Sequence, residues 1–410
     1  MLRYTYIIVV FFLLSFNMTS KKLKEGTYRA VLTLNEATGL ELPFNFEVTY
    51  KGKKPIITIR NADEKIYVDE ISIQGDSINF KMPVFDTEFR TKLVGNDLEG
   101  VWINHYKTEN NRIKFKASFG ESKRFMFAAT QGSHAFEGKW EVSFSPNAKD
   151  SSKAIALFHH VEQSDFVTGT FLTETGDYRF LEGMKTGNQL YLSCFDGSHA
   201  FLFIAELKGG EKTEGLFYSG LSWKEPWIGQ RNETFELAKA NEISFVKNEN
   251  EKIGFSFPDL NHKKISLSDP KFDNKPVIIQ IMGSWCPNCM DESRYFAALY
   301  DQYNKDGLEI VALAFEKTND FELAKKQLLR LKTRLQIHYD ILITQASGKA
   351  KAAELFPALN TITAFPTTIF LNKNHEVVKV HTGFSGPATG SAYENYKKET
   401  ESFILNLLKS

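Results

Sequence analysis

Two cysteines separated by only two residues, Cys286 and Cys289, constrain this chain more than any other feature of its sequence. They follow the apolar run of residues 277–282, and Gly283 and Ser284 form the turn between the run and the pair. A short apolar run bounded by a turn is typical of a buried strand. The sequence therefore predicts a strand, a turn and a helix that begins at the first cysteine.

This arrangement favours redox chemistry. Two thiols at the start of a helix can close a small disulfide ring, and the helix N-terminus lowers the pKa of the first thiol. We expect Cys286 to attack a substrate disulfide and Cys289 to resolve the mixed disulfide. Zinc binding is the alternative, but it needs two more ligands, and the chain has one other cysteine, Cys194, and no histidine near the pair. The sequence thus predicts no metal and no cofactor beyond a redox-active disulfide.

The pattern around the cysteine pair alternates between strands and helices. Strands are expected at residues 277–282, 308–315, near 341, 367–371 and 377–381, and helices at 286–303, from about 320, 349–356 and 393–408. This order predicts an α/β domain at residues 246–410 that ends in a hairpin and a helix.

Two motifs of this region resemble a known family. They are Trp285-Cys286-Pro287-Asn288-Cys289 with Glu292 three residues on, and Phe365-Pro366-Thr367-Thr368 at the start of a strand. Over residues 253–408 the chain resembles the thioredoxin superfamily, and more closely the extracytoplasmic TlpA and ResA-like thiol–disulfide oxidoreductases. The family has an additional helical stretch before the proline, which residues 344–359 would supply.

The resemblance implies roles for several side chains. In such folds the proline is cis and faces the disulfide, so Pro366 and its neighbours Phe365 and Thr367 are expected to bind the substrate chain. Trp285 would shield the disulfide and contact the partner, although a tryptophan at the end of a core strand is often simple packing.

Acidic residues near the pair are further candidates. Glu292 shares a helix face with Cys289, so a partly buried carboxylate there could exchange a proton with the thiol. The alternative is a favourable interaction with the helix dipole. We expect Asp291 to be solvated surface, and Glu316, after the strand of residues 310–315, to be a second candidate for the same site.

The region before this domain shows short alternating runs, for instance at residues 27–32, 44–48, 77–82 and 112–116, which predict mainly antiparallel β structure. It also looks duplicated. Residues 25–28 recur at 137–140 and residues 99–102 at 214–217, and a Phe-Asp pair occurs at 85–86 and again at 195–196. We expect a duplicated barrel or sandwich at residues 21–245 with half-units at 24–135 and 136–240. Cys194 is expected to be a small buried core residue rather than a redox partner. The histidines show no metal-ligand spacing and are expected to be surface or core residues.

Residues 1–20 have the composition of a secretory signal. One arginine precedes an apolar run that is too short to span a bilayer, and polar residues follow. We expect a signal peptide and a periplasmic or otherwise extracytoplasmic protein, membrane-anchored if the signal is uncleaved. An exported reductant must be recharged, which implies a membrane-embedded thiol electron donor as a partner.

Charge excludes one class of partner. Lys plus Arg equals Asp plus Glu, 50 against 50, so no global field attracts nucleic acid. The leading hypothesis is a protein disulfide reductase acting on disulfide-containing exported proteins, with the β region as a targeting, docking or dimerisation module, the last giving a homodimer. The alternative is a ligand-binding or docking β protein with an accessory thioredoxin domain. A peroxidase would carry Thr or Ser three residues before its reactive cysteine and Pro four before that, where this chain has Gly283 and Ile279.

Overall fold

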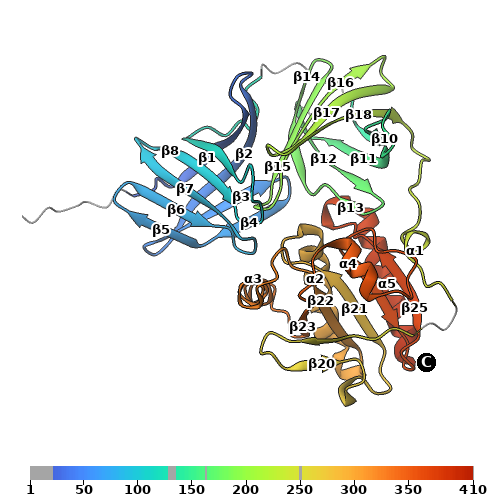
Figure 1. The fold of residues 1–410 in the computed structure, drawn as a ribbon. Helices are drawn as coiled ribbons and strands as arrows, with labels where there is room; N and C mark the ends of the chain where they lie inside the picture. Colours follow the sequence, from blue (N-terminus) through green and yellow to red (C-terminus); the bar gives the residue numbers. More distant parts are fainter. Residues whose placement is uncertain (1–21, 128–134, 162–163, 249–251, 410) are drawn as a thin grey trace, which may run out of the picture.

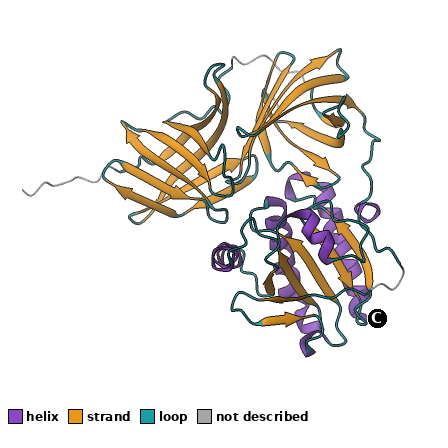
Figure 2. Cartoon of the chain, in the orientation of Figure 1, coloured by secondary structure: helices purple, strands orange, loops and turns teal. Residues whose placement is uncertain are grey.

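The structure is a computed structural model that describes residues 22–127, 135–161, 164–248 and 252–409. Two β units precede an α/β domain that contains nearly all of the helices (Figures 1 and 2). The predicted fold class is confirmed. The expected export signal at residues 1–20 lies outside the described residues. None of the helices in the described ranges is long and apolar enough to cross a membrane.

The first β unit is a nine-stranded sheet whose two edge strands are β4 and β5. Consecutive strands pair antiparallel except β4 and β5, and β1 also pairs with β9. Their bounds are β1 Gly26–Asn35, β2 Leu40–Lys51, β3 Lys54–Asn61, β4 Glu64–Val68, β5 Glu70–Gln74, β6 Ser77–Lys81, β7 Thr87–Val94, β8 Asp97–Asn104 and β9 Arg112–Phe119.

The second β unit also has nine strands, and pairing between β11 and β12 closes it into a barrel. Its strands are β10 Gly138–Phe144, β11 Ser152–His160, β12 Phe166–Thr173, β13 Gly176–Asp177, β14 Leu181–Thr186, β15 Gln189–Phe195, β16 Ala200–Lys208, β17 Lys212–Ser219 and β18 Trp223–Arg231. The two units therefore share strand number and antiparallel order, as the repeated sequence motifs indicated.

One repeated glycine has the same physical cause in both units. A Cβ atom on Gly100 of β8 would overlap the carbonyl oxygen of Arg90 on the neighbouring strand, and one on Gly215 of β17 would overlap the carbonyl oxygen of Ile204. Because the paired strands approach so closely, only glycine fits at either position.

Aromatic side chains fill the interior of each β unit. The first contains the stacked pair Phe80 and Phe89, with ring centroids 4.5 Å apart, and the second contains Phe171 and Phe203 at 4.4 Å. Trp227 in the second unit is 1% exposed. Such packing is that of a filled core rather than of a ligand cavity.

The C-terminal domain is built on a five-stranded sheet with the order β23-β22-β21-β24-β25. Strands β21, β22 and β23 are parallel, while β24 and β25 form a hairpin in which β24 runs antiparallel to β21. The strands are β21 Val277–Met282, β22 Glu309–Ala314, β23 Asp340–Ile343, β24 Thr367–Leu371 and β25 Val377–Thr382. The helices are α2 Pro287–Tyr303, α3 Phe321–Arg334, α4 Gly348–Leu355 and α5 Ser391–Lys409.

The order of these elements agrees with the order expected from the sequence. The central strand β21 is buried at every position, which explains its nearly uninterrupted apolar pattern. A short hairpin of β19 Ser256–Pro258 and β20 Lys264–Ser266 precedes it. The segment that contains α1 (Ala240–Ile243) leads from the second β unit into this domain (Figure 1).

Candidate active site

The cysteine pair lies where β21 passes into α2. Cys286 is the N-cap residue of α2 and forms a disulfide with Cys289. The turn is tight, because the backbone N–H of Cys286 donates to the carbonyl oxygen of Gly283 at 3.1 Å. Cys286 is 7% exposed and Cys289 is fully buried. Of the two sulfurs, only the first is therefore accessible to a second molecule.

The loop before β24 covers the disulfide. The peptide bond between Phe365 and Pro366 is cis, as the resemblance implied. The carbonyl oxygen of Phe365 lies 3.5 Å from Cys286 Sγ, and the Phe365 ring packs edge-on against Trp285 at 5.8 Å. Trp285 donates from Nε1 to the Phe315 carbonyl at 3.0 Å, which fixes the indole beside the cysteines.

Thr367 has a different environment from its two neighbours in the loop. Its side chain is fully buried and donates to the Ala364 carbonyl, and its residue pairs within the sheet with both β21 and β25. This position argues against the expected substrate contact of Thr367, because neither its side chain nor its place in the sheet offers a free surface.

Glu292 lies in the turn of α2 that follows Cys289 and is fully buried. Its two carboxylate oxygens accept hydrogen bonds from Gln280 Nε2 at 2.9 Å and from Thr368 Oγ1 at 2.8 Å. Burial raises its pKa to about 7, and the hydrogen bonds only partly oppose this effect. The same Gln280 nitrogen lies 3.5 Å from the carbonyl oxygen of Cys289. A carboxyl group that titrates near neutrality is thus linked through one side chain to the inner cysteine.

Glu316 forms a second buried carboxyl group on the other side of the motif. It follows β22 and accepts from the backbone N–H of Ser284 at 2.8 Å and from its hydroxyl at 2.6 Å. Burial raises its pKa to about 7 as well. Tyr106 of the first β unit lies close enough that Glu316 contributes to raising the pKa of the Tyr106 phenol. Glu316 therefore holds the turn before the cysteines.

The prediction for Asp291 was wrong. It is 4% exposed and forms ion pairs with Arg179 of the second β unit and, at 2.9 Å, with Arg294. The buried Arg179 also pairs with Glu64 of the first β unit at 2.5 Å and lies 3.5 Å from Asp196. The β units cover this face of α2, and local sequence gives no sign of that contact.

The β units also contact the active-site motif itself. Ser198 donates from its hydroxyl to the carbonyl oxygen of Trp285 at 3.1 Å, and Asn288 donates from Nδ2 to the carbonyl oxygen of Asp177 at 3.3 Å. The side chain of Phe85 packs in the same hydrophobic cluster as the α/β domain. The aspartates of both repeated Phe-Asp pairs lie at this interface, because Asp86 accepts from Gln327 Nε2 at 3.3 Å and Asp196 lines a cavity together with Asp291. These pairs are the sequence signal that could have indicated the interface.

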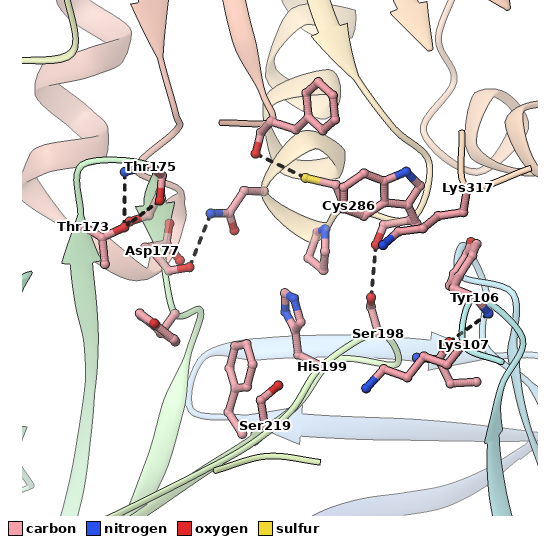
Figure 3. Close-up of a pocket in the computed structure, with 18 residues that line it drawn as sticks. Tyr106, Lys107, Thr173, Thr175, Asp177, Ser198, His199, Ser219, Cys286 and Lys317 are labelled. Carbon is pink, nitrogen blue, oxygen red and sulfur yellow. Dashed lines mark hydrogen bonds between the residues drawn. The ribbon is translucent and has the colours of Figure 1, made fainter. Parts of the chain in front are cut away.

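A cavity of about 390 Å³ opens beside Cys286, between the β units and the α/β domain (Figure 3). We call it the interdomain cleft. The α/β domain contributes Trp285, Cys286, Pro287, Asn288, Lys317 and Phe365, and the β units contribute Asn104, Tyr106, Lys107, Thr173, Thr175, Gly176, Asp177, Tyr178, Ser198, His199, Phe201 and Ser219.

His199 lines the interdomain cleft, which the sequence did not indicate. Its Nδ1 atom lies 3.1 Å from the buried Asp196 carboxylate, and its ring stacks on Phe201. In contrast, Cys194 is free and fully buried, as expected for a small core residue. Within the described parts of the chain, no three His, Cys, Asp or Glu side chains are grouped to hold a metal ion.

Three comparisons relate the chain to known proteins. The family model described as Redoxin matches residues 247–396, within the α/β domain. The thiol-disulfide oxidoreductase ResA of Bacillus thuringiensis subsp. konkukian is 30% identical over 160 residues, which are 38% of this chain and 82% of that protein. ResA of Halalkalibacterium halodurans is 30% identical over 131 residues, 32% of this chain and 66% of that protein. A solved thiol:disulfide interchange protein of Chlorobium tepidum TLS aligns with a TM-score of 0.31 and 16% identity, over 39% of this chain and 97% of that one.

Proposed function

This chain belongs to the ResA-like thiol–disulfide oxidoreductases of the thioredoxin superfamily, and we propose that it is an extracytoplasmic disulfide reductase acting on exported proteins. The observation that carries this proposal is the Cys286–Cys289 disulfide at the start of α2, with its outer sulfur beside the cis-proline loop. The proposed reaction uses the redox-active disulfide and requires no other cofactor.

The reaction runs from the reduced dithiol. The Cys286 thiolate attacks one sulfur of the substrate disulfide, so that a mixed disulfide forms and the first substrate thiolate leaves and takes up a proton. Cys289 then loses its proton and attacks Cys286 Sγ, which releases the second substrate thiolate. Two electrons pass from the cysteine pair to the substrate, and the enzyme disulfide remains.

Glu292 is the proposed proton acceptor for Cys289. Since burial raises its pKa to about 7, the carboxylate and its protonated form are both populated near neutral pH. Efficient proton transfer requires a group whose pKa lies near the working pH. The fully buried carboxylate, which is held by Gln280 and Thr368, supports this role better than a simple interaction with the helix dipole.

The substrate chain is proposed to bind along Trp285, Phe365 and Pro366. The Phe365 carbonyl oxygen lies 3.5 Å from the accessible sulfur, the Trp285 and Phe365 rings contact each other, and Pro366 follows Phe365 through the cis peptide bond. The exposed backbone of a disulfide-containing chain would lie against this loop.

Location and electron supply follow from the predicted export signal at residues 1–20. An exported reductase must regain two electrons after each turnover, so we propose a membrane-embedded thiol donor as its partner. The β units, whose interiors are filled with aromatic side chains, act in this proposal as docking or dimerisation modules rather than as ligand-binding barrels. The proposed boundaries are residues 24–135 and 136–240 for the two β units and 246–410 for the α/β domain.

The experiment compares the two directions of exchange. The full chain, reduced with dithiothreitol and desalted, is mixed with a peptide that contains one disulfide, and the oxidised chain is mixed with the reduced peptide. We expect rapid peptide reduction in the first mixture and slow peptide oxidation in the second. Cys286→Ser is the control and should abolish both reactions. Faster transfer of the disulfide from protein to peptide would contradict the reductase proposal.

A further inference from the structure

Two lysines from different parts of the chain line the interdomain cleft. Lys107 follows β8 of the first β unit, and Lys317 follows β22 of the α/β domain. Figure 3 shows both side chains extending into the cavity on either side of Ser198, near the cysteine motif. Lys317 Nζ lies 4.3 Å from the centroid of the Trp285 ring, the residue directly before the reactive cysteine.

Neither lysine is neutralised by the described part of the chain. Lys107 donates to the hydroxyl of Ser222 at 3.1 Å, and Lys317 lies over the face of an aromatic ring, but neither ammonium group pairs with a carboxylate of the described residues. Burial, with a contribution from the neighbouring Lys317, lowers the pKa of Lys107. Two like charges held close together in a partly enclosed space favour an anion between them.

The acidic residue of the same cleft does not cancel this charge. Asp177 is buried, and one of its oxygens accepts from the backbone N–H of Gly386 at 2.5 Å while the other accepts from the backbone N–H of Arg179 at 2.7 Å. Burial raises the pKa of Asp177, which favours its uncharged form. The accessible side of the cleft is therefore positive, although the whole chain has no net charge.

The shape of the cleft limits what can reach the sulfur. Cys286 is 7% exposed, and the β units lie opposite it across a cavity of about 390 Å³, a volume typical of small-molecule sites. A rigid surface of a folded protein cannot enter this space, whereas a flexible segment of a few residues can.

We propose that the interdomain cleft selects substrates whose disulfide-bonded cysteine lies in a flexible acidic segment. A carboxylate of that segment binds between Lys107 and Lys317. This inference rests on the proposed function and names its substrate class. The β units thereby supply part of the substrate site, because Lys107 belongs to the first unit and other lining residues, such as Ser198 and His199, belong to the second.

The test uses three synthetic peptides that each carry one cysteine in a disulfide with pyridine-2-thiol. The peptides differ only in the residues beside the cysteine, which are Glu, Gln or Lys. One reduced protein and one peptide disulfide give the oxidised Cys286–Cys289 pair, one peptide thiol and one pyridine-2-thione, whose absorbance reports the rate. The full-length chain is compared with Lys107→Gln/Lys317→Gln at low and high salt.

The matched control removes two lysines outside the cleft. Lys349 of α4 and Lys398 of α5 are exposed and do not line the cavity, so Lys349→Gln/Lys398→Gln makes the same change in total charge. The control should retain the rates of the unchanged protein with all three peptides.

For the unchanged protein we expect the Glu peptide to react about tenfold faster than the Gln peptide at low salt, and the Lys peptide to react more slowly still. The ratio of Glu to Gln rates should fall toward one in Lys107→Gln/Lys317→Gln and at high salt. Equal rates for the three peptides, or an unchanged ratio in that variant, would overturn the inference while leaving the proposed function intact. Failure to reduce any of the peptides would instead contradict the proposed function.

Discussion

Replacing Glu292 by Gln should stabilise the folded protein and, at the same time, slow its release of the mixed disulfide. Gln has the shape and charge of the protonated carboxyl group, so the variant keeps the neutral form at every pH. The buried carboxylate costs stability because burial raises the pKa of Glu292 from its ordinary value of 4.5 to about 7. A pKa difference of one corresponds to about 1.36 kcal/mol, so the difference between 4.5 and 7 amounts to about 3 kcal/mol.

The sign of this effect depends on pH. Below about pH 4.5 the group is protonated in the folded and unfolded states, so it does not change the free energy of unfolding. As the pH rises from 4.5 to 7, the unfolded chain loses the proton first, so the folded state becomes progressively less stable. We expect Glu292→Gln to match the unchanged protein near pH 4 and to exceed its free energy of unfolding by about 3 kcal/mol above pH 7. Urea unfolding followed by circular dichroism across this range measures the difference.

The same substitution should slow the release of the mixed disulfide. Removing a general base costs about 10²-fold or more in rate, and the step affected is deprotonation of Cys289. The mixed disulfide between Cys286 and a peptide should therefore accumulate. Rapid quenching in acid followed by mass spectrometry measures the fraction of protein that carries it.

Glu316→Gln is the matched control for both measurements. It removes another buried carboxyl group with a pKa of about 7, but one that contacts Ser284 instead of the residues around Cys289. It should give a similar gain in stability at high pH without accumulation of the mixed disulfide. If Glu292→Gln resolves the complex as quickly as the unchanged protein, or Glu316→Gln slows it equally, the assignment of Glu292 as the proton acceptor is refuted.

Three further predictions concern the cysteine pair, the interface and the barrel. Cys289→Ser should trap a stable mixed disulfide at Cys286, visible on non-reducing gels, whereas rapid release of the peptide would show that another thiol resolves it. Arg179→Met should destabilise the chain by about 3 kcal/mol or more, because it removes the buried cation that Glu64, Asp196 and Asp291 share; an unchanged urea midpoint would contradict this. Gly183→Ala should lower the thermal midpoint, because the added Cβ would overlap a carbonyl oxygen of β15, and a variant as stable as the unchanged protein would disprove that close approach.

Local patterns were sufficient to predict the α/β domain. The buried strand before Cys286, the helix after it and the cis peptide bond before Pro366 all occur where the motifs placed them. Each of these features depends on residues that are close together in sequence or on a motif that recurs across a family. The shared strand order of the two β units likewise follows the repeated glycine motifs.

The contacts between the units could not be predicted in the same way. Arg179 and Asp291 are 112 residues apart, and nothing in the sequence around Asp291 distinguishes a buried ion pair from a solvated residue at the start of a helix. Lys107 and His199 reach the cleft only because the β units pack over α2. The repeated Phe-Asp pairs indicated only a duplication, and contacts such as that of Asp86 with Gln327 become visible only in the folded chain.

The reduction potential of the Cys286–Cys289 pair in the full-length chain tests the central claim most directly. Equilibration with glutathione or dithiothreitol buffers, followed by alkylation of the free thiols, gives the potential on the scale where thioredoxin lies at about −270 mV. A reversible couple below about −230 mV is the value expected for a disulfide reductase that a membrane donor recharges. A potential of about −120 mV would make the protein a disulfide-forming oxidant, and the absence of any reversible couple would contradict the redox function itself.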